Sequence, residues 1–324
     1  MAPRPRRRPV GTMTEMAVVV VSYNTRELTL AALASARVAT DGRDAVVVAA
    51  DNGSGDGTCA AVRAAFPDVV LLENPDNPGY GPAINRAAAL HPAVYLCAMN
   101  ADVMLAPASL QTLRAYLAGH PECALAGPAL AYPDGTPQRS CKRFPTLGQA
   151  LGELLGVHAL LPENRWVRRF YYADRDLSRD TPVDCVSGAV MLIRGDAFAR
   201  VGGFDEGFRM YFEETDLCRR FRAAGLGVAF CPDARAVHHL GASTRETSAR
   251  QVEYYLSYVR YFRKHHGRAA RAALTLAVVL GTLGRMAGLP VRYPPLDRRR
   301  AALLRAKEGA CARLLRALGP SAAV

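Results

Sequence analysis

The residues Ala17-Val-Val-Val-Val-Ser-Tyr-Asn-Thr25 decide the fold of this chain. Its continuous apolar run, rich in β-branched side chains, is typical of a central strand buried on both faces of a parallel sheet. The strand ends in the polar segment Ser22–Asn24. A helix is predicted to follow through about residue 37, with Thr25 as its N-cap.

Three more units of the same kind follow along the chain. Strands are predicted at 45–50, 69–72 and 94–99, and each is followed by a short loop and a helix. This alternation predicts right-handed βαβ crossovers and an α/β fold with a doubly wound, mostly parallel sheet that carries helices on both faces.

Polar motifs follow three of these strands, at the carboxyl ends where such sheets bind ligands. They are Ser22–Asn24, Asp51–Gly57 and Asn100–Asp102. The Asp51 carboxylate can accept hydrogen bonds from a nucleobase or a ribose hydroxyl, and the glycines beside it, Gly53 among them, let the backbone approach a ligand. A plain turn is the alternative. The segment is neither a Walker loop nor a Gly-x-Gly-x-x-Gly fingerprint.

Asn100 and Asp102 place two oxygen donors two residues apart at the end of a strand. Hard oxygen donors suit Mg²⁺ or Mn²⁺, which commonly binds one or two carboxylates together with substrate phosphates. His238, ahead of a small polar loop, can complete a site with Asp102. The alternatives are helix capping ahead of Pro107 and a structural histidine.

An acidic cluster lies between Gly202 and Arg220, with Glu213 and Glu214 directly after the apolar residues Met210-Tyr-Phe212. Carboxylates beside apolar side chains have shifted pKa values, which a general base needs. Acids that merely begin a helix are the alternative. We expect Glu214 to be the base and Glu213 its close rival. Asp216 is expected to orient the site or to pair with Arg219 or Arg220.

The formal net charge of +12 is concentrated at the two ends of the chain. Residues 1–10 carry +4 and residues 260–324 carry +12, whereas residues 11–259 carry −4. This argues against a nucleic-acid-binding core and for basic flanks at an anionic surface such as the inner leaflet of a membrane. A solvated arginine-rich tail is the alternative.

The uncharged segment 272–284 is too short to span a bilayer, which takes roughly 20 apolar residues. It can lie in the membrane interface, or pack in a core or the interface of a homo-oligomer. Eight isolated cysteines and the lack of an apolar signal segment after the basic N-terminus lead us to expect a cytoplasmic protein, peripheral to the membrane.

Together these motifs resemble those of family 2 glycosyltransferases, in the same order, over about residues 16–266. The residues that carry the resemblance are Val18–Asn24, Asp51–Gly57, Asn77-Pro-Gly-Tyr-Gly81 with Asn85, Asn100–Asp102, Gly202–Asp205 and Glu213–Arg219. Ser140–Thr146 and His238–Ser243 are similar to the bacterial rhamnosyltransferase branch.

The resemblance implies a GT-A fold and an inverting hexosyl transfer from a dTDP-, UDP- or GDP-sugar to a lipid-linked or polysaccharide acceptor of the cell envelope. Donor contacts would come from Ser22, Tyr23, Asn24, Asp51, Gly53, Asn77, Gly79, Asn85 and Asn100, and acceptor contacts from Asp205. Asp102 and His238 would hold Mg²⁺ or Mn²⁺, and a carboxylate of the acidic pair, with Asp216 nearby, would act as base. Glu214 stands where the family often has Asp, and Asn100 makes the metal motif Asn-x-Asp.

The predicted organisation is a disordered basic arm at 1–14, a GT-A domain at 15–266 and a basic helical extension at 267–324. The domain would divide into a nucleotide-binding half (about 15–127) and an acceptor or catalytic half (about 128–266). Two other functions stay open. A sugar-nucleotide pyrophosphorylase would need a Gly-x-Gly-Thr-Arg loop, which Val18–Asn24 lacks. A non-catalytic membrane-surface or nucleic-acid-binding protein is suggested by charge alone.

Overall fold

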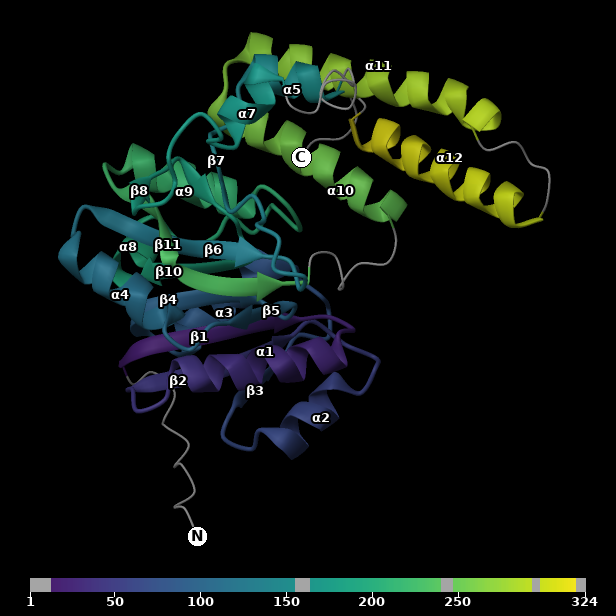
Figure 1. The fold of residues 1–324 in the computed structure, drawn as a ribbon. Coiled ribbons are helices and arrows are strands. Elements are labelled where there is room, and N and C mark those ends of the chain that lie inside the picture. The colour runs from purple at the N-terminus through teal and green to yellow at the C-terminus, as the bar shows by residue number, and fades with distance from the viewer. Residues whose placement is uncertain (1–12, 155–163, 240–246, 293–297, 319–324) are drawn as a thin grey trace. The chain divides into compact units, whose positions relative to one another are not determined.

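The computed structural model describes residues 13–154, 164–239, 247–292 and 298–318, which fall into two compact units. The first unit is built on one nine-stranded sheet (Figure 1). Its strands lie in the order β3 (Val70–Glu73), β2 (Ala45–Asp51), β1 (Thr14–Ser22), β4 (Ala93–Asn100), β10 (Val190–Arg194), β6 (Cys123–Ala131), β11 (Gly227–His238) and β5 (Val103–Leu105), and β8 (Thr181–Pro182) pairs with β11.

The first four strands are parallel to one another, and their register brings the predicted polar motifs together. Ser22 at the end of β1 pairs with Asp51 at the end of β2, while Val21 pairs with Asn100 at the end of β4. Strand β10 runs antiparallel to both β4 and β6, and β6 is parallel to β11. The predicted mostly parallel α/β sheet is therefore confirmed.

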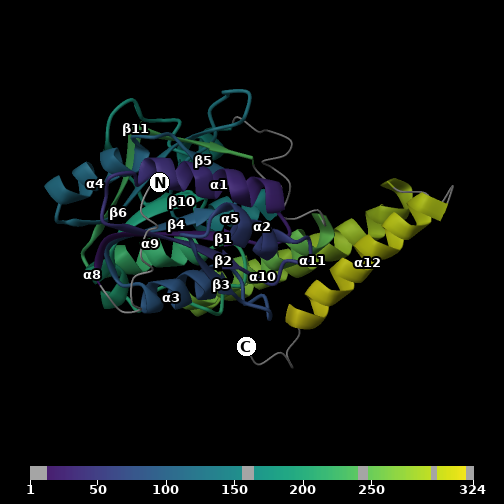
Figure 2. The same cartoon turned by 90° about the horizontal axis from the view of Figure 1, so that it is seen from below.

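Helices cover both faces of the sheet because β1 is apolar on both of its sides (Figure 2). Val18 and Val20 pack in the core that includes α1 (Arg26–Ala39) and α4 (Ser109–Gly119). Ala17 and Val19 pack in the opposite core with α3 (Tyr80–Leu90), α8 (Gly195–Arg200) and α9 (Glu213–Ala223). Helix α2 (Thr58–Ala65) contributes Val62 to the first of these cores.

The sheet extends beyond the predicted strands. Strands β5 and β6 were not predicted, because β5 has only three residues and β6 contains Gly127, Pro128 and four alanines, which disfavour strands. Residues Gly227–His238 form one strand, β11, with an irregularity between Cys231 and Arg235. A small separate sheet pairs β7 (Cys141–Lys142) with β9 (Cys185–Val186).

The second unit is helical and comprises described residues of 145–170, 210–212 and the chain from 247 onward. Its helices are α5 (Leu147–Leu154), α7 (Arg165–Phe170), α10 (Thr247–His265), α11 (Arg268–Arg292) and α12 (Arg298–Leu318). Phe212 stacks on Tyr258 with ring centroids 4.6 Å apart, and Tyr254 donates a 2.7 Å hydrogen bond to Glu153. No helix in the described ranges is long and apolar enough to cross a membrane.

Residues 1–12 of the predicted basic arm lie outside the described residues, as do 155–163 and the small polar loop after His239. The predicted division of the chain at residue 266 falls between α10 and α11, both of which belong to the second unit. That division stays a prediction.

Candidate active site

The Asp51 carboxylate lies at the joined ends of β1 and β2, where it is 1% exposed. Ser22 Oγ donates to its Oδ2 at 2.9 Å, Ser54 Oγ donates to the same oxygen at 2.6 Å, and the Ser54 amide donates to Oδ1 at 2.8 Å. A carboxylate offers about four acceptor positions. Three protein donors therefore fix the orientation of Asp51 and leave it able to accept one more hydrogen bond.

The two loops beside Asp51 are joined to each other. Asn24, at a left-handed φ of 52°, receives a hydrogen bond from Gly55 and donates its own amide to Ser54. Gly53 has φ 79°, and a Cβ there would lie 3.0 Å from the Pro75 carbonyl oxygen. Tyr23 stays 40% exposed at the same edge. The backbone of this loop pair is thus rigid, with an aromatic ring free to contact a ligand.

The loop 74–81, which contains Asn77 and Gly79 of the family resemblance, is held in place by close backbone contacts. Asn77 has φ 45°, and Gly79 has φ 102° with the Arg209 carbonyl oxygen 2.6 Å from the position of a Cβ. Asn85 accepts from the Phe204 amide at 2.8 Å and donates to its carbonyl at 2.9 Å. Asn85 therefore holds the Gly202–Asp205 motif against α3, and its role in substrate binding stays a prediction.

Asp102 and His238 are brought together by the pairing of β5 with β11, which sets Val103 opposite His238. Asp102 Oδ1 lies 3.4 Å from His238 Nε2, and the two residues are 3% and 5% exposed. Within the described ranges, Asp102 Oδ1 has no hydrogen-bond partner although it is buried. Asn100, half-buried at the end of β4, is two residues away along the chain.

These two side chains fit a divalent cation. The described residues contain no cluster of three or more His, Cys, Asp or Glu side chains placed to hold a metal. Mg²⁺, however, is usually bound by one or two protein ligands plus substrate phosphates, at about 2.0–2.1 Å. Two donors 3.4 Å apart can both reach one such ion, and an unpartnered buried carboxylate oxygen is the atom that a cation would stabilise.

The acidic pair lies in the first turn of α9. Glu213 and Glu214 are 8% and 7% exposed. Tyr211 and Phe212, directly before them, both have φ 66°, a strained conformation for aromatic residues. Such strain persists only where the surrounding structure enforces it. The strained residues directly precede α9, so that Glu213 and Glu214 are its first two residues.

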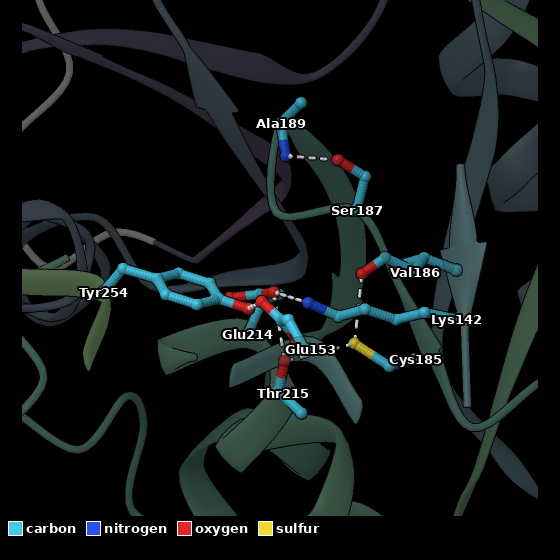
Figure 3. A network of polar contacts seen from close by, with 9 residues as sticks. All are labelled: Lys142, Glu153, Cys185, Val186, Ser187, Ala189, Glu214, Thr215 and Tyr254. Atoms are coloured by element: carbon cyan, nitrogen blue, oxygen red, sulfur yellow. Dashed lines mark hydrogen bonds and ion pairs between the residues drawn. The ribbon is translucent and has the colours of Figure 1, made fainter. Parts of the chain in front are cut away.

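Lys142 forms a part-buried ion pair with Glu214, and its sequence motif does not predict this contact. Its Nζ donates to Glu214 Oε1 at 2.7 Å, and Thr215 Oγ1 donates to the same oxygen at 3.1 Å (Figure 3). In the described part of the chain, no hydrogen bond is donated to Glu214 Oε2. That oxygen is the one available to accept a proton from a ligand.

The pKa values of the two carboxyl groups are shifted in opposite directions. Burial, followed by the charge of Glu214, raises the pKa of Glu213 to about 8. Burial also acts to raise the pKa of Glu214, but the Lys142 charge and hydrogen bond outweigh it and lower this pKa below the ordinary value. These opposite shifts favour a protonated Glu213 beside an ionised Glu214 at neutral pH.

Gly188 packs against Glu214, and Tyr80 in turn contacts Gly188. The Tyr80 hydroxyl donates to the Gly188 carbonyl at 3.1 Å, and a Cβ on Gly188 would lie 3.3 Å from Glu214 Cβ. Burial raises the pKa of Tyr80, and the charges of Glu213, Glu214 and Asp102 add to this effect. The Asn100 amide donates to the carbonyl of Ala189 at 2.8 Å, so β4 and the turn before β10 meet here.

Asp216 and Asp205 take structural positions. Asp216 is fully buried and pairs with Arg220 at 2.7 Å, one of its two predicted partners. Arg220 also donates to the Val201 carbonyl, which ties α9 to the end of α8. Asp205 accepts from the Gly207 amide at 2.9 Å, as in a turn. Their predicted contacts with substrate stay predictions.

The fold and this site define a glycosyltransferase of the GT-A class. A solved mannosyltransferase of Pyrobaculum calidifontis, in complex with GDP-Man and Mn²⁺, superposes with a TM-score of 0.56, covering 98% of this chain and 86% of that one, at 19% identity. The family described as "Glycosyltransferase like family 2" matches residues 14–260, and the chain belongs to that family. The predicted family and fold are confirmed.

Two curated relatives are rhamnosyltransferases. The N-acetylglucosaminyl-diphospho-decaprenol L-rhamnosyltransferase of Mycobacterium tuberculosis (strain H37Rv) is 33% identical over 308 residues, which is 90% of this chain and 97% of the relative. The rhamnosyltransferase WbbL of Escherichia coli (strain K12) is 38% identical over 77 residues, 24% of this chain and 29% of the relative.

Proposed function

We propose that this glycosyltransferase moves L-rhamnose from a nucleotide-diphosphate donor to a sugar on a polyprenyl diphosphate, with inversion at the anomeric carbon. The likeness to the mycobacterial L-rhamnosyltransferase carries the proposal, because it extends over nearly the full length of both chains. Its name specifies both the sugar and the diphospho-decaprenol acceptor. Envelope glycan synthesis is the process that such an acceptor serves.

The donor nucleotide is assigned to the edge formed by β1 and β2. The remaining acceptor position of Asp51 suits a ribose hydroxyl or a base N–H, and its three protein donors keep the carboxylate oriented. Tyr23 and the Asn24–Gly53 backbone would contact the nucleoside. Screening dTDP-, UDP- and GDP-sugars by thermal shift identifies the nucleotide.

The diphosphate is assigned to the edge near Asp102 and His238, which would hold Mg²⁺ or Mn²⁺. Bound there, the cation would neutralise negative charge on the departing nucleotide diphosphate. The Mn²⁺ in the mannosyltransferase with the same fold is consistent with this assignment. Asn100 contributes a neutral oxygen to the same edge.

Glu214 is assigned as the general base. The acceptor hydroxyl oxygen attacks the anomeric carbon on the face opposite the diphosphate, and the hydroxyl proton passes to Glu214 Oε2. The bond from the anomeric carbon to the diphosphate oxygen breaks, and its electron pair stays on the diphosphate. Glu214 suits this step because it is ionised at neutral pH and has an oxygen that accepts no other hydrogen bond from the described residues.

We also propose that α11 lies at the membrane surface that carries the acceptor. Leu276, Leu280 and Leu283 are 58%, 57% and 47% exposed, and their spacing puts them on one face of the helix. Arg268 and Arg271 are exposed at its N-terminal end, where anionic headgroups would meet them. Replacing the three leucines by serine should reduce sedimentation with anionic vesicles, whereas Val38→Ser, which alters an exposed apolar residue of α1, should not. Equal sedimentation of all three proteins would exclude this surface.

A transfer assay with dTDP-rhamnose and a synthetic prenyl-diphosphate-linked N-acetylglucosamine tests the activity. Glu214→Gln should lower kcat by about 10²-fold or more while donor binding is retained. Asp102→Ala should remove metal-dependent transfer. Full wild-type activity in EDTA would exclude the metal assignment. Transfer of other sugars but not of rhamnose would exclude rhamnose as the transferred sugar.

A further inference from the structure

The two ring nitrogens of His238 face different partners. Nδ1 lies 3.0 Å from Gln138 Oε1, and Nε2 lies 3.4 Å from Asp102 Oδ1. A neutral imidazole carries its proton on one nitrogen only, and a cation binds the other. Which nitrogen keeps the proton therefore decides whether the edge beside Asp102 can accept a cation.

The orientation of the Gln138 amide answers this question. Its Nε2 donates to the carbonyl oxygen of His238 at 2.7 Å and to that of Ala131 at 3.4 Å. Turning the amide over would set its oxygen against two carbonyl oxygens, which cannot donate. Oε1 must therefore face His238 Nδ1, and since Oε1 only accepts, Nδ1 carries the proton.

Gln138 is itself held firmly. Its backbone amide donates to the Leu130 carbonyl of β6 at 2.8 Å, and its carbonyl accepts from Ser140 Oγ at 3.0 Å. Ser140 Oγ in turn accepts from the Leu130 amide at 2.8 Å. The chain segment after β6 is thus fixed against the strand, and the glutamine side chain is presented to the end of β11.

We propose that Gln138 is a positioning residue that holds His238 as the Nδ1–H tautomer, so that bare Nε2 and Asp102 Oδ1 form a pair of donors for a hard divalent cation. The inference rests on the proposed metal-assisted transfer and deepens it. Without the cation two acceptors face each other at 3.4 Å in a buried place, which is unfavourable. A cation between them removes the conflict.

Nitrogen-15 NMR of the apo protein, labelled at histidine, reads the tautomer without any transfer reaction. His238 is assigned by the loss of its signals in His238→Gln. At pH 8 we expect a proton on Nδ1, which faces Gln138 Oε1, and none on Nε2. In Gln138→Leu the proton should move toward Nε2, where Asp102 accepts it.

Mn²⁺ binding, followed by electron paramagnetic resonance, tests the consequence. Gln138→Leu should weaken it by about 10–100-fold, the usual cost of losing such a supporting residue. Gln111→Leu is the matched control, because in the described part of the chain Gln111 Nε2 has no hydrogen-bond partner. It should bind Mn²⁺ like the wild type.

Three results overturn the inference: a wild-type ring with its proton on Nε2, a doubly protonated ring at pH 8, or Gln138→Leu with unchanged tautomer and Mn²⁺ affinity. If Asp102→Ala loses Mn²⁺ and Gln138→Leu does not, the role of Gln138 fails and the metal site stands. A wild type that binds no Mn²⁺ overturns the metal assignment itself.

Discussion

Replacing Lys142 by methionine should move the acid limb of the pH–rate profile of transfer to higher pH. Lys142 Nζ lies 2.7 Å from Glu214 Oε1, and the two side chains are 26% and 10% exposed. Glu214 in turn holds the pKa of Lys142 above its usual value, against the lowering effect of burial. Methionine has a similar length and removes the charge, so the buried Glu214 carboxylate loses its compensating cation.

The magnitude follows from the geometry. Unit charges 3–4 Å apart attract each other by roughly 4–6 kcal/mol at an effective dielectric constant of about 20, and solvent at Lys142 reduces this. Cations at such distances lower carboxyl pKa values by about 1–3. Because the folded-state pKa of Glu214 is depressed, the wild type keeps its base ionised down to low pH. At a pH on the acid side of the limb, Lys142→Met should have a kcat/KM lower by about 10-fold for each pH unit that the limb moves.

The assay is kcat/KM for dTDP-rhamnose from pH 5 to 10, with Lys142→Arg and Arg143→Met as comparisons. Arginine keeps the charge and should keep the limb near its wild-type place. Arg143 is the neighbour of Lys142 but pairs with Asp174 and lies over Tyr172, so its removal should leave the limb unmoved. A Lys142→Met profile lowered equally at every pH, with no movement of the limb, would refute the argument.

Two further predictions concern stability. The folded-state pKa of Glu213, about 8, lies above its ordinary 4.5, so stability from this group is full below pH 4.5 and is lost as the pH rises through 8. The difference in unfolding free energy between Glu213→Gln and the wild type should therefore be more in favour of the variant at pH 9 than at pH 5, as urea titrations would show. An equal difference at both pH values would contradict the raised pKa. Gly79→Ala should cost about 1–3 kcal/mol because of its φ and the close Arg209 carbonyl, whereas Gly55→Ala, with open space around it, should unfold near the wild-type urea concentration. A Gly79→Ala midpoint equal to that of Gly55→Ala would contradict the contact.

The nucleotide edge could be predicted from sequence because its information is local. The runs that become β1, β2 and β4 are continuous and apolar, and each is followed at once by its polar motif. Parallel strands bring their carboxyl ends together whatever the remaining sequence does. The register of Ser22 with Asp51 is the direct outcome.

The partners of these motifs could not be predicted in the same way. Lys142 is 72 residues from Glu214, and Gln138 is 100 residues from His238. Both come from the segment after β6, a strand whose alanines, glycine and proline give a weak strand signal. Without β6 there is no basis for placing that segment beside the ends of β11 and α9. From the sequence, Asp102 and His238 could be placed together only because both side chains can bind a metal ion.

The structure also assigns different roles to Glu213 and Glu214, which composition alone does not distinguish. Two adjacent buried carboxylates cannot both be ionised at low cost, and Lys142 selects Glu214 as the charged one. Glu213 is then a neutral carboxyl group, and glutamine at that position is a neutral group of the same shape. Glu213→Gln should therefore retain much of its turnover at pH 7, whereas Glu214→Gln should not. The reverse result would assign the base to Glu213 and make the Lys142–Glu214 pair structural.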